Sequence, residues 1–228
     1  MKLNSLYEYP ASMRSLVQGS RHYDVGQEKL PSVTTILSAT QPEEKKKSLA
    51  AWAARVGDAE ATRIKDQAAA RGTIMHHILE GWIKDEPHVD LTEVGQLAEK
   101  MAHQILIQGL RDRLTEYWGL EVTLYYPGLY AGATDVVGVY DGAESIVDFK
   151  QSNKPKRREW IEDYKLQLAA YALAHNEIYG TAINKGVNLI CTKDNLFQEF
   201  IFDGDEFRQA KFDWLKRVDQ YYNEKDKK

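Results

Sequence analysis

The sequence predicts an α/β sandwich in which a mixed central sheet is flanked by helices and preceded by an N-terminal helical region. The first observation is that apolar residues recur at helical spacing between residues 43 and 118. The second is that this period changes to two at residue 120, as expected for strands. The third is a pair of β-branched runs that flank Asp141-Gly142, a dipeptide typical of tight hairpin turns.

Length and composition are ordinary for one globular domain. We expect a single domain over residues 1–228, with a mainly helical region at about 30–118 and an α/β core at about 119–224. The net charge of −4 excludes a protein that coats nucleic acid through bulk positive charge. Because no run of about 18 apolar residues occurs, we expect no membrane segment. The lone Cys191 can form no internal disulfide, which favours a reducing compartment.

The N-terminal half of the sequence predicts helices. Each combines an apolar stripe with a start or stop signal; Asp58 is expected to cap one of them, and Gly119 to end the last. The predicted helices begin or lie at residues 31–37, 43–57, 58–82 and 93–118, and a hairpin is expected around residues 22–29.

Strand patterns dominate the second half. The order is three meandering strands, a helix, two strands and a last helix, which Asp205 is expected to cap. The strands are predicted at residues 120–126, 130–140, 143–150, 187–192 and 196–202, and the helices at about 159–179 and 205–222.

The Asp141-Gly142 turn determines which residues face each other across the hairpin. A two-residue turn places Tyr140 opposite Ala143, and counting outward along both strands then brings Asp135 opposite Asp148. Their Cβ atoms would lie about 5 Å apart on one face of the sheet. Two facing carboxylates repel each other, so we expect a divalent cation, Mg²⁺ or Mn²⁺, to bind between them.

Lys150 belongs to the same group, because side chains alternate along a strand and Lys150 therefore shares a face with Asp148. The hairpin thus presents two acids and one ammonium group together. The alternative is a partly solvated edge hairpin whose charged groups only face water.

Three further features carry less information by themselves. His76 and Glu80 lie four residues apart and share a helix face, and this spacing alone favours a surface ion pair. Trp160 and Tyr164 could stack on bases, although aromatic residues at helical spacing are more often core residues. A basic loop after the hairpin is well placed to meet phosphates, through Lys154, Lys156, Arg157 and Arg158.

Together these motifs resemble those of the PD-(D/E)XK nuclease superfamily. Asp135, followed by Asp148-Phe149-Lys150 across a hairpin, resembles its central signature. Two additions resemble its RecB-like branch. Residues 72–76 with Glu80 are similar to that branch's upstream histidine motif, and residues 167–171 to its Q-x-x-x-Y motif.

The similarity extends to a narrower group. Residues 30–34 and 148–156 resemble the mitochondrial genome maintenance exonucleases and their phage relatives. Gln151 departs from this pattern, because that group usually has Thr at the position. The resemblance covers about residues 30–202, and it implies the fold of these nucleases.

The resemblance also implies metal-dependent hydrolysis of DNA phosphodiester bonds, preferentially in single strands and from a free end, during replication, repair or recombination. Asp135, Asp148 and the Phe149 carbonyl oxygen would bind Mg²⁺ or Mn²⁺, and Glu80 would assist through water. His76 would be a further ligand, since the G-x-x-x-H spacing selects it over the adjacent His77.

The remaining roles follow from the same resemblance. Lys150 would position the attacking water and offset charge that develops on the phosphorane. Gln167 and Tyr171 lie four apart on one helix face and would hold Lys150 or the substrate backbone. The helices of residues 43–118 would form an arch or wall around a threaded strand.

Two other functions stay open. One is a structure-selective endonuclease with the same metal ligands but an open groove. The other is a catalytically silent DNA-binding module, against which the complete Asp, Asp and Lys set argues. No protein partner is predicted. Because the first residues lack a signal-peptide apolar core, we expect the cytoplasm of a bacterial or phage-infected cell.

Overall fold

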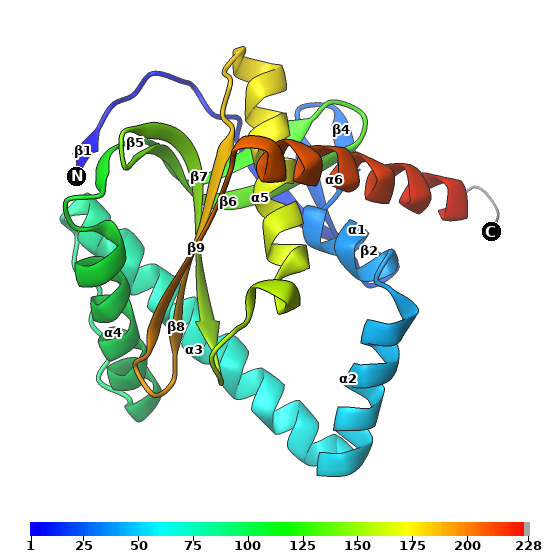
Figure 1. Ribbon diagram of the computed structural model, residues 1–228, viewed down its shortest axis with the longest axis vertical. Coiled ribbons are helices and arrows are strands. Elements are labelled where there is room, and N and C mark those ends of the chain that lie inside the picture. Colours follow the sequence, from blue (N-terminus) through cyan, green and yellow to red (C-terminus); the bar gives the residue numbers. More distant parts are fainter. Residues whose placement is uncertain (226–228) are drawn as a thin grey trace.

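A six-stranded mixed sheet forms the centre of the protein, and helices cover both of its faces (Figure 1). The computed structural model describes residues 1–225. The strands of the sheet, in spatial order, are β1 (Lys2–Leu3), β5 (Leu114–Tyr126), β6 (Tyr130–Tyr140), β7 (Ala143–Ser152), β8 (Lys185–Thr192) and β9 (Phe197–Asp203). Antiparallel β5, β6 and β7 form the predicted meander, and β7 pairs with β8 in parallel. The predicted α/β class with a mixed sheet is confirmed.

The helices flank this sheet on two sides. In Figure 1, α3 and α4 lie beside one face, whereas α5 and α6 lie beside the other. A π-helical turn, Leu106–Leu110, extends α4, and a 3₁₀ turn, Arg158–Trp160, precedes α5. The bounds are α1 (Val33–Ala39), α2 (Glu43–Val56), α3 (Asp58–Lys84), α4 (Glu93–Ile105), α5 (Glu162–Tyr179) and α6 (Gly204–Lys225).

Alternate residues of β7 enter opposite cores. Val147 and Phe149 belong to the core with α3 and α4. Ile146 belongs to the core with α5 and α6. Because side chains alternate along the strand, Asp148 and Lys150 share the face of Ile146, which is the face that α5 covers.

The β6–β7 hairpin has the predicted register. Asp141 and Gly142 both have positive φ, 47° and 72°, as a type I′ turn requires. Tyr140 pairs with Ala143, and the pairing continues to Val136 and Val147. The ladder ends there, one position before the two aspartates.

The predicted helix over residues 93–118 is wrong in its last part. The helical turns end at Leu110, and strand β5 begins at Leu114, well before the predicted residue 120. Register shifts in β5 fall between Leu114 and Glu116 and between Tyr117 and Gly119. Since a bulge adds one residue, the buried Leu114 and Tyr117 stand three apart in a strand, and this spacing imitates a helical stripe.

Smaller differences occur at helix ends and near the N-terminus. Gly57, with φ of 86°, ends α2 and precedes α3, so Asp58 is the first residue of α3 and not its cap. Asp205 likewise lies inside the first turn of α6. The hairpin expected near residues 22–29 is confirmed as β3 and β4, but β1 and β2 were not predicted. β1 belongs to the central sheet. A second, three-stranded sheet consists of β2 (Ser12–Val17), β3 (Ser20–Val25) and β4 (Glu28–Pro31).

Within residues 1–225, none of the helices combines the length and the apolar character that crossing a membrane requires.

Helices α2 and α3 form a V that projects beyond the sheet (Figure 1). No residue of α2 is buried, and the helix is tied to the start of α5 by an ion pair between Lys45 and Asp163. In α3, Ala61 is the one buried residue before Arg71, whereas the later turns pack in the core. The first half of α3 therefore lies beside the end of the sheet and is almost entirely outside the core.

An uncharged histidine lies inside an aromatic cluster near the N-terminus. His175 is fully buried, and its ring lies between Tyr7, Tyr9 and Tyr179. Nε2 is 3.2 Å from the Tyr9 hydroxyl, and Nδ1 is 2.8 Å from the Thr181 hydroxyl. Burial lowers the pKa of His175 to about 4.

We predict that His175 makes the fold less stable as the pH falls. Its pKa is lower in the folded chain than the usual 6.5, so its stabilisation is complete above pH 6.5 and is lost as the pH falls towards 4. The loss is up to about 3 kcal/mol. Urea unfolding from pH 7.5 to 4.5 should show a steeper decline for the wild type than for His175→Gln. Parallel pH profiles would contradict the prediction.

Candidate active site

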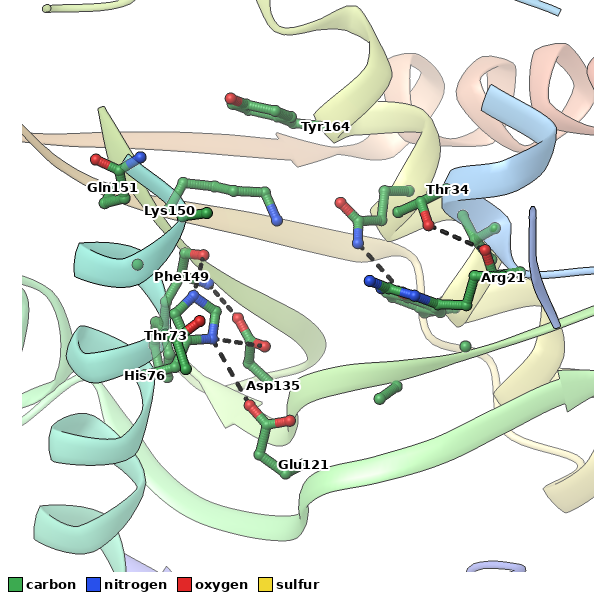
Figure 2. A pocket seen from close by; sticks show the side chains of 18 of the residues that line it. Arg21, Thr34, Thr73, His76, Glu121, Asp135, Phe149, Lys150, Gln151 and Tyr164 are labelled. Carbon is green, nitrogen blue, oxygen red and sulfur yellow. Dashed lines mark hydrogen bonds and ion pairs between the residues drawn. The ribbon is translucent and has the colours of Figure 1, made fainter. Parts of the chain in front are cut away.

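A pocket of about 610 Å³ opens where the paired ends of β6 and β7 meet α3 and α5. Its walls come from elements far apart in the sequence, and Figure 2 shows several of the side chains that project into it. The lining includes the predicted site residues His76, Glu80, Asp135, Phe149, Lys150, Tyr164, Gln167 and Tyr171.

A histidine and two carboxylates converge on one side of the pocket (Figure 2). One ligand atom each from His76, Glu121 and Asp135 lies within 4.8 Å of the others. His76 Nδ1 is 3.3 Å from Asp135 Oδ1 and 3.7 Å from Glu121 Oε1. Nε2 of the same ring is 3.0 Å from the Phe149 carbonyl oxygen. When Nε2–H donates to that carbonyl, Nδ1 is left facing the two carboxylates with a lone pair, as a metal ligand requires.

The charge on His76 depends on these neighbours. Burial alone would lower the pKa of the imidazole, but the charge of Asp135 and hydrogen bonds that the ring donates to Asp135 and Glu121 raise it to about 10. The ring is therefore an imidazolium when no cation is bound. A divalent cation would take the place of that proton, and a set of carboxylates and imidazole suits such an ion.

Asp135 is held in place by the neighbouring strand. Its Oδ2 accepts a hydrogen bond from the Phe149 N–H at 2.6 Å, two positions beyond the last pair of the β6–β7 ladder. Burial would raise the pKa of Asp135, but the charges of His76 and Lys150 hold it below the usual value. Asp135 is thus an ionised, oriented carboxylate.

Asp148 lies deeper than Asp135, with a side chain only 3% exposed. It accepts hydrogen bonds from Lys150 Nζ at 2.7 Å and from Asn188 Nδ2 at 3.0 Å. Burial raises the pKa of Asp148 to about 6, with help from the charge of Asp135 and against the charge of Lys150. Burial would lower the pKa of Lys150, but the charges of Asp148 and Asp135 raise it, so Lys150 is an ammonium.

Gln167 and Tyr171 reach the pocket from one face of α5. Gln167 Nε2 donates to the Tyr171 hydroxyl at 3.2 Å. Tyr171 crosses β6 at Gly132, where a Cβ would lie 2.9 Å from the ring, so the close approach depends on glycine. Burial raises the pKa of Tyr171, which keeps its hydroxyl neutral and able to donate.

Other predicted residues lie further from the cluster of His76, Glu121 and Asp135. Glu80 borders the pocket, but its carboxylate pairs with Lys84 at 2.6 Å and it is not in the cluster with His76. Tyr164 lies under Lys150, with Nζ 5.3 Å from the ring centroid. Trp160 is 57% exposed and stacks on Arg157.

The basic loop divides into two parts. Lys154 and Lys156 line a second pocket, of about 790 Å³, which shares Gln151 and Tyr164 with the first. Arg158 instead turns away to Glu206, 2.6 Å distant, and donates to the Ile201 carbonyl. The structure therefore brings the two lysines near the site but not Arg158.

Three site residues were missed in the sequence. Glu121 stands between Leu120 and Val122, which pair with Val136 and Thr134, so it lies opposite Asp135. Applying the same register count to the turn at residues 127–129 would have identified it. Arg14 and Arg21, from the unpredicted β2 and its partner β3, also line the pocket. No motif marked these two arginines, because β2 was not predicted and nothing in the sequence placed the β3–β4 hairpin beside the site.

Comparisons with known proteins agree with the resemblance that the motifs indicated. The chain is 28% identical over 203 residues to mitochondrial genome maintenance exonuclease 1 of Mus musculus, which covers 84% of this chain and 59% of that protein. It is 26% identical over 207 residues to the protein of the same name from Homo sapiens, with 86% and 59% covered. The chain thus matches 59% of the length of these curated relatives. No family model matches the chain.

Solved structures are more distant. A proposed exonuclease of Eubacterium rectale has a TM-score of 0.49 and 16% identity, over 69% of this chain and 68% of that one. An alkaline exonuclease of Laribacter hongkongensis has a TM-score of 0.30 and 9% identity, over 67% and 82%. The relationship therefore depends on sequence: over more than four-fifths of its length, the chain is similar to mitochondrial genome maintenance exonucleases, as its motifs predicted.

Proposed function

We propose that the protein is a divalent-cation-dependent deoxyribonuclease that hydrolyses single-stranded DNA from a free end. The observation that carries the proposal is the convergence of His76, Glu121 and Asp135 in one pocket, whose wall includes Lys150, held there by the buried Asp148. Similarity to proteins named exonucleases supports it. Replication, repair or recombination of DNA is the setting that this activity fits.

Mg²⁺ or Mn²⁺ is the proposed cofactor. His76, Glu121 and Asp135 would hold it, with Asp148 and the Phe149 carbonyl oxygen beside them, and an imidazole ligand favours Mn²⁺ alongside Mg²⁺. When bound, the cation would polarise a phosphoryl oxygen and lower the pKa of a water molecule. Glu121 takes the place in this set that the sequence suggested for Glu80.

Lys150 supplies the positive charge that the reaction needs. Both oxygens of Asp148 lie within 2.7 Å of Nζ, which fixes the ammonium group at the pocket wall. There it would orient the attacking water and stabilise the additional negative charge of the transition state. Gln167 and the neutral Tyr171 hydroxyl would hold the substrate backbone through hydrogen bonds.

The second pocket offers a path for the rest of the strand. Its walls come from Trp52 of α2, from α3 and from the segment after β7. Lys154 and Lys156 would meet phosphates, and Tyr164, shared by both pockets, would stack on a base. Because α2 and α3 border this pocket opposite the sheet, a strand in it would pass between the helical V and the core. Trp160, Arg157 and Arg158 are peripheral to this path.

Two alternatives remain distinct from this proposal. A structure-selective endonuclease would use the same metal ligands but would not need a free end. A silent DNA-binding module would bind without cutting, and the retained Asp135, Asp148 and Lys150 make it the weaker alternative.

We predict that Asp148→Asn abolishes cleavage without lowering the melting temperature in EDTA. The raised pKa of Asp148 means that ionisation costs stability once the pH exceeds about 6, and a neutral amide avoids this cost. Melts at pH 8 with and without Mn²⁺ test it: proteins that keep Asp148 should gain stability from the metal, whereas Asp148→Asn should not. Asp194→Asn, in an exposed turn, is the control. A much lower melting temperature in EDTA would make Asp148 a structural residue.

Lys150→Ala should reduce single-turnover cleavage at least about 100-fold, because it removes a charge placed for the transition state. Affinity for DNA and Mn²⁺ should stay near that of the wild type. Lys154→Ala is the contrasting variant and should weaken binding with little effect on the bound-state rate. If Lys150→Ala changed affinity alone, Lys150 would be an ordinary phosphate contact.

A closed single-stranded circle should resist digestion, whereas the same molecule linearised is degraded. The reason is that a strand enclosed between the helical V and the core must enter by its end. Duplex ends should be cut poorly, since a duplex is wider than a single strand. Electrophoresis of circular and linear substrates with Mg²⁺, Mn²⁺ or EDTA gives the answer. Rapid loss of the circle would favour the endonuclease.

A further inference from the structure

Arg71 of α3 is a buried cation without an anionic partner. The residue is 7% exposed. Nε and Nη2 donate to Gln151 Oε1 at 3.1 and 2.6 Å, and Nη2 also donates to the side-chain oxygen of Asn153. Among residues 1–225, no carboxylate forms an ion pair with it, and burial lowers the pKa of its guanidinium. Two neutral amide oxygens therefore orient a charge that they do not neutralise.

Such an arrangement is unusual in a protein interior. A buried charge is normally paired with an opposite charge, because removing it from water is unfavourable. A purely structural link between α3 and β7 could be made by neutral groups at lower cost. The contact is closely fitted, since a Cβ on Gly72 would lie 3.2 Å from Gln151 Cγ. The retained charge therefore calls for an anion from outside the chain.

The second pocket, which Arg71 lines, has the charge that such an anion needs. Five cations border it, and Glu60 is the one carboxylate among its described lining residues. Glu60 is already paired with Arg63 at 2.6 Å. No ion pair involves Lys154, Lys156 or Lys193 within residues 1–225. Four cations thus face the same cavity without a counter-charge from the described chain.

The position of Arg71 relates this cavity to the proposed chemistry. Gln151, which holds the guanidinium, directly follows Lys150 in β7 and lines both pockets. An anion at Arg71 would therefore lie beside the proposed cleavage site but not in it. Arginine suits this role because its planar guanidinium keeps further N–H groups free for phosphate oxygens.

We propose that Arg71, together with Lys156 and Lys193, forms a receptor for a DNA phosphate next to the one that is cleaved. The inference rests on the proposed nuclease function. The receptor makes efficient cleavage depend on a second phosphate in the strand. That phosphate is either an internal diester or the terminal group of the strand, and both present the same oxygens to the guanidinium.

Binding without cleavage gives the first test. Anisotropy of a labelled single-stranded oligonucleotide is titrated in EDTA with wild type, Arg71→Gln and Lys65→Gln. Arg71→Gln should bind at least about tenfold more weakly, with a salt slope smaller by about 0.7, the value for one single-strand phosphate contact. Lys65→Gln, which replaces an exposed cation on the same helix that does not line the pocket, is the matched control and should bind like the wild type.

Lys193→Gln is a second variant that tests the receptor even if Arg71→Gln does not fold. Lys193 is exposed in the same pocket, so its replacement should leave the melting temperature unchanged and still reduce affinity and salt slope. If Arg71→Gln and Lys193→Gln both bind like Lys65→Gln, the receptor does not exist and Arg71 is a structural link. Because EDTA prevents cleavage, this result is independent of whether the protein is a nuclease.

Uncharged phosphate analogues locate the anion. Oligonucleotides with one methylphosphonate on either side of the cleaved position, or with and without a terminal phosphate, are digested by wild type and Arg71→Gln. At one position the analogue should slow the wild type but not slow Arg71→Gln further. The proposal would be overturned if the analogue slowed digestion by the same factor in wild type and Arg71→Gln at every position. Failure of the wild type to cut any substrate would instead reject the nuclease function.

Discussion

Two buried carboxylates, Asp135 and Asp148, require compensating charge, and the arrangement of the surrounding elements meets that requirement. Lys150 comes from the same strand as Asp148, whereas His76 must be brought from α3. Because the imidazole also contacts the Phe149 carbonyl, α3 is attached to the C-terminal part of β7 as well as to the core. The residue that balances the charge of Asp135 therefore also fixes the position of α3 against β7.

The same attachment divides α3 into two parts with different roles. Residues from Arg71 onward pack in the core, and the preceding turns extend with α2 beyond the sheet. The boundary between these parts lies where Arg71 and His76 contact the strand of Lys150. A helix that is rigid in the core can thus present one residue to the cluster and another to the neighbouring cavity. The cavity has a surplus of cations although the chain is net acidic.

Local sequence rules predicted the part of the site that lies on one hairpin. The Asp141-Gly142 turn determines the register, the register places Asp135 near Asp148, and alternation adds Lys150. These relations span fewer than about 20 residues and depend on backbone geometry alone, so they are readable without the fold. The strand within residues 111–118 was misread because bulges in β5 gave buried residues a helical spacing.

Other parts of the site depend on contacts between distant segments. Glu121 reaches the cluster because β5 pairs with β6, and Arg71 gains its partners because α3 passes the end of β7. Glu121 is found only by counting the β5–β6 register outward from the turn at residues 127–129. Arg71 has no local signal, since an arginine in a helix is usually solvated. Local sequence patterns are thus enough for most of the α/β order, for the hairpin register and for the Asp135, Asp148 and Lys150 group. Which distant side chains complete that group follows only from the packed structure, because burial and charge compensation arise when the elements pack together.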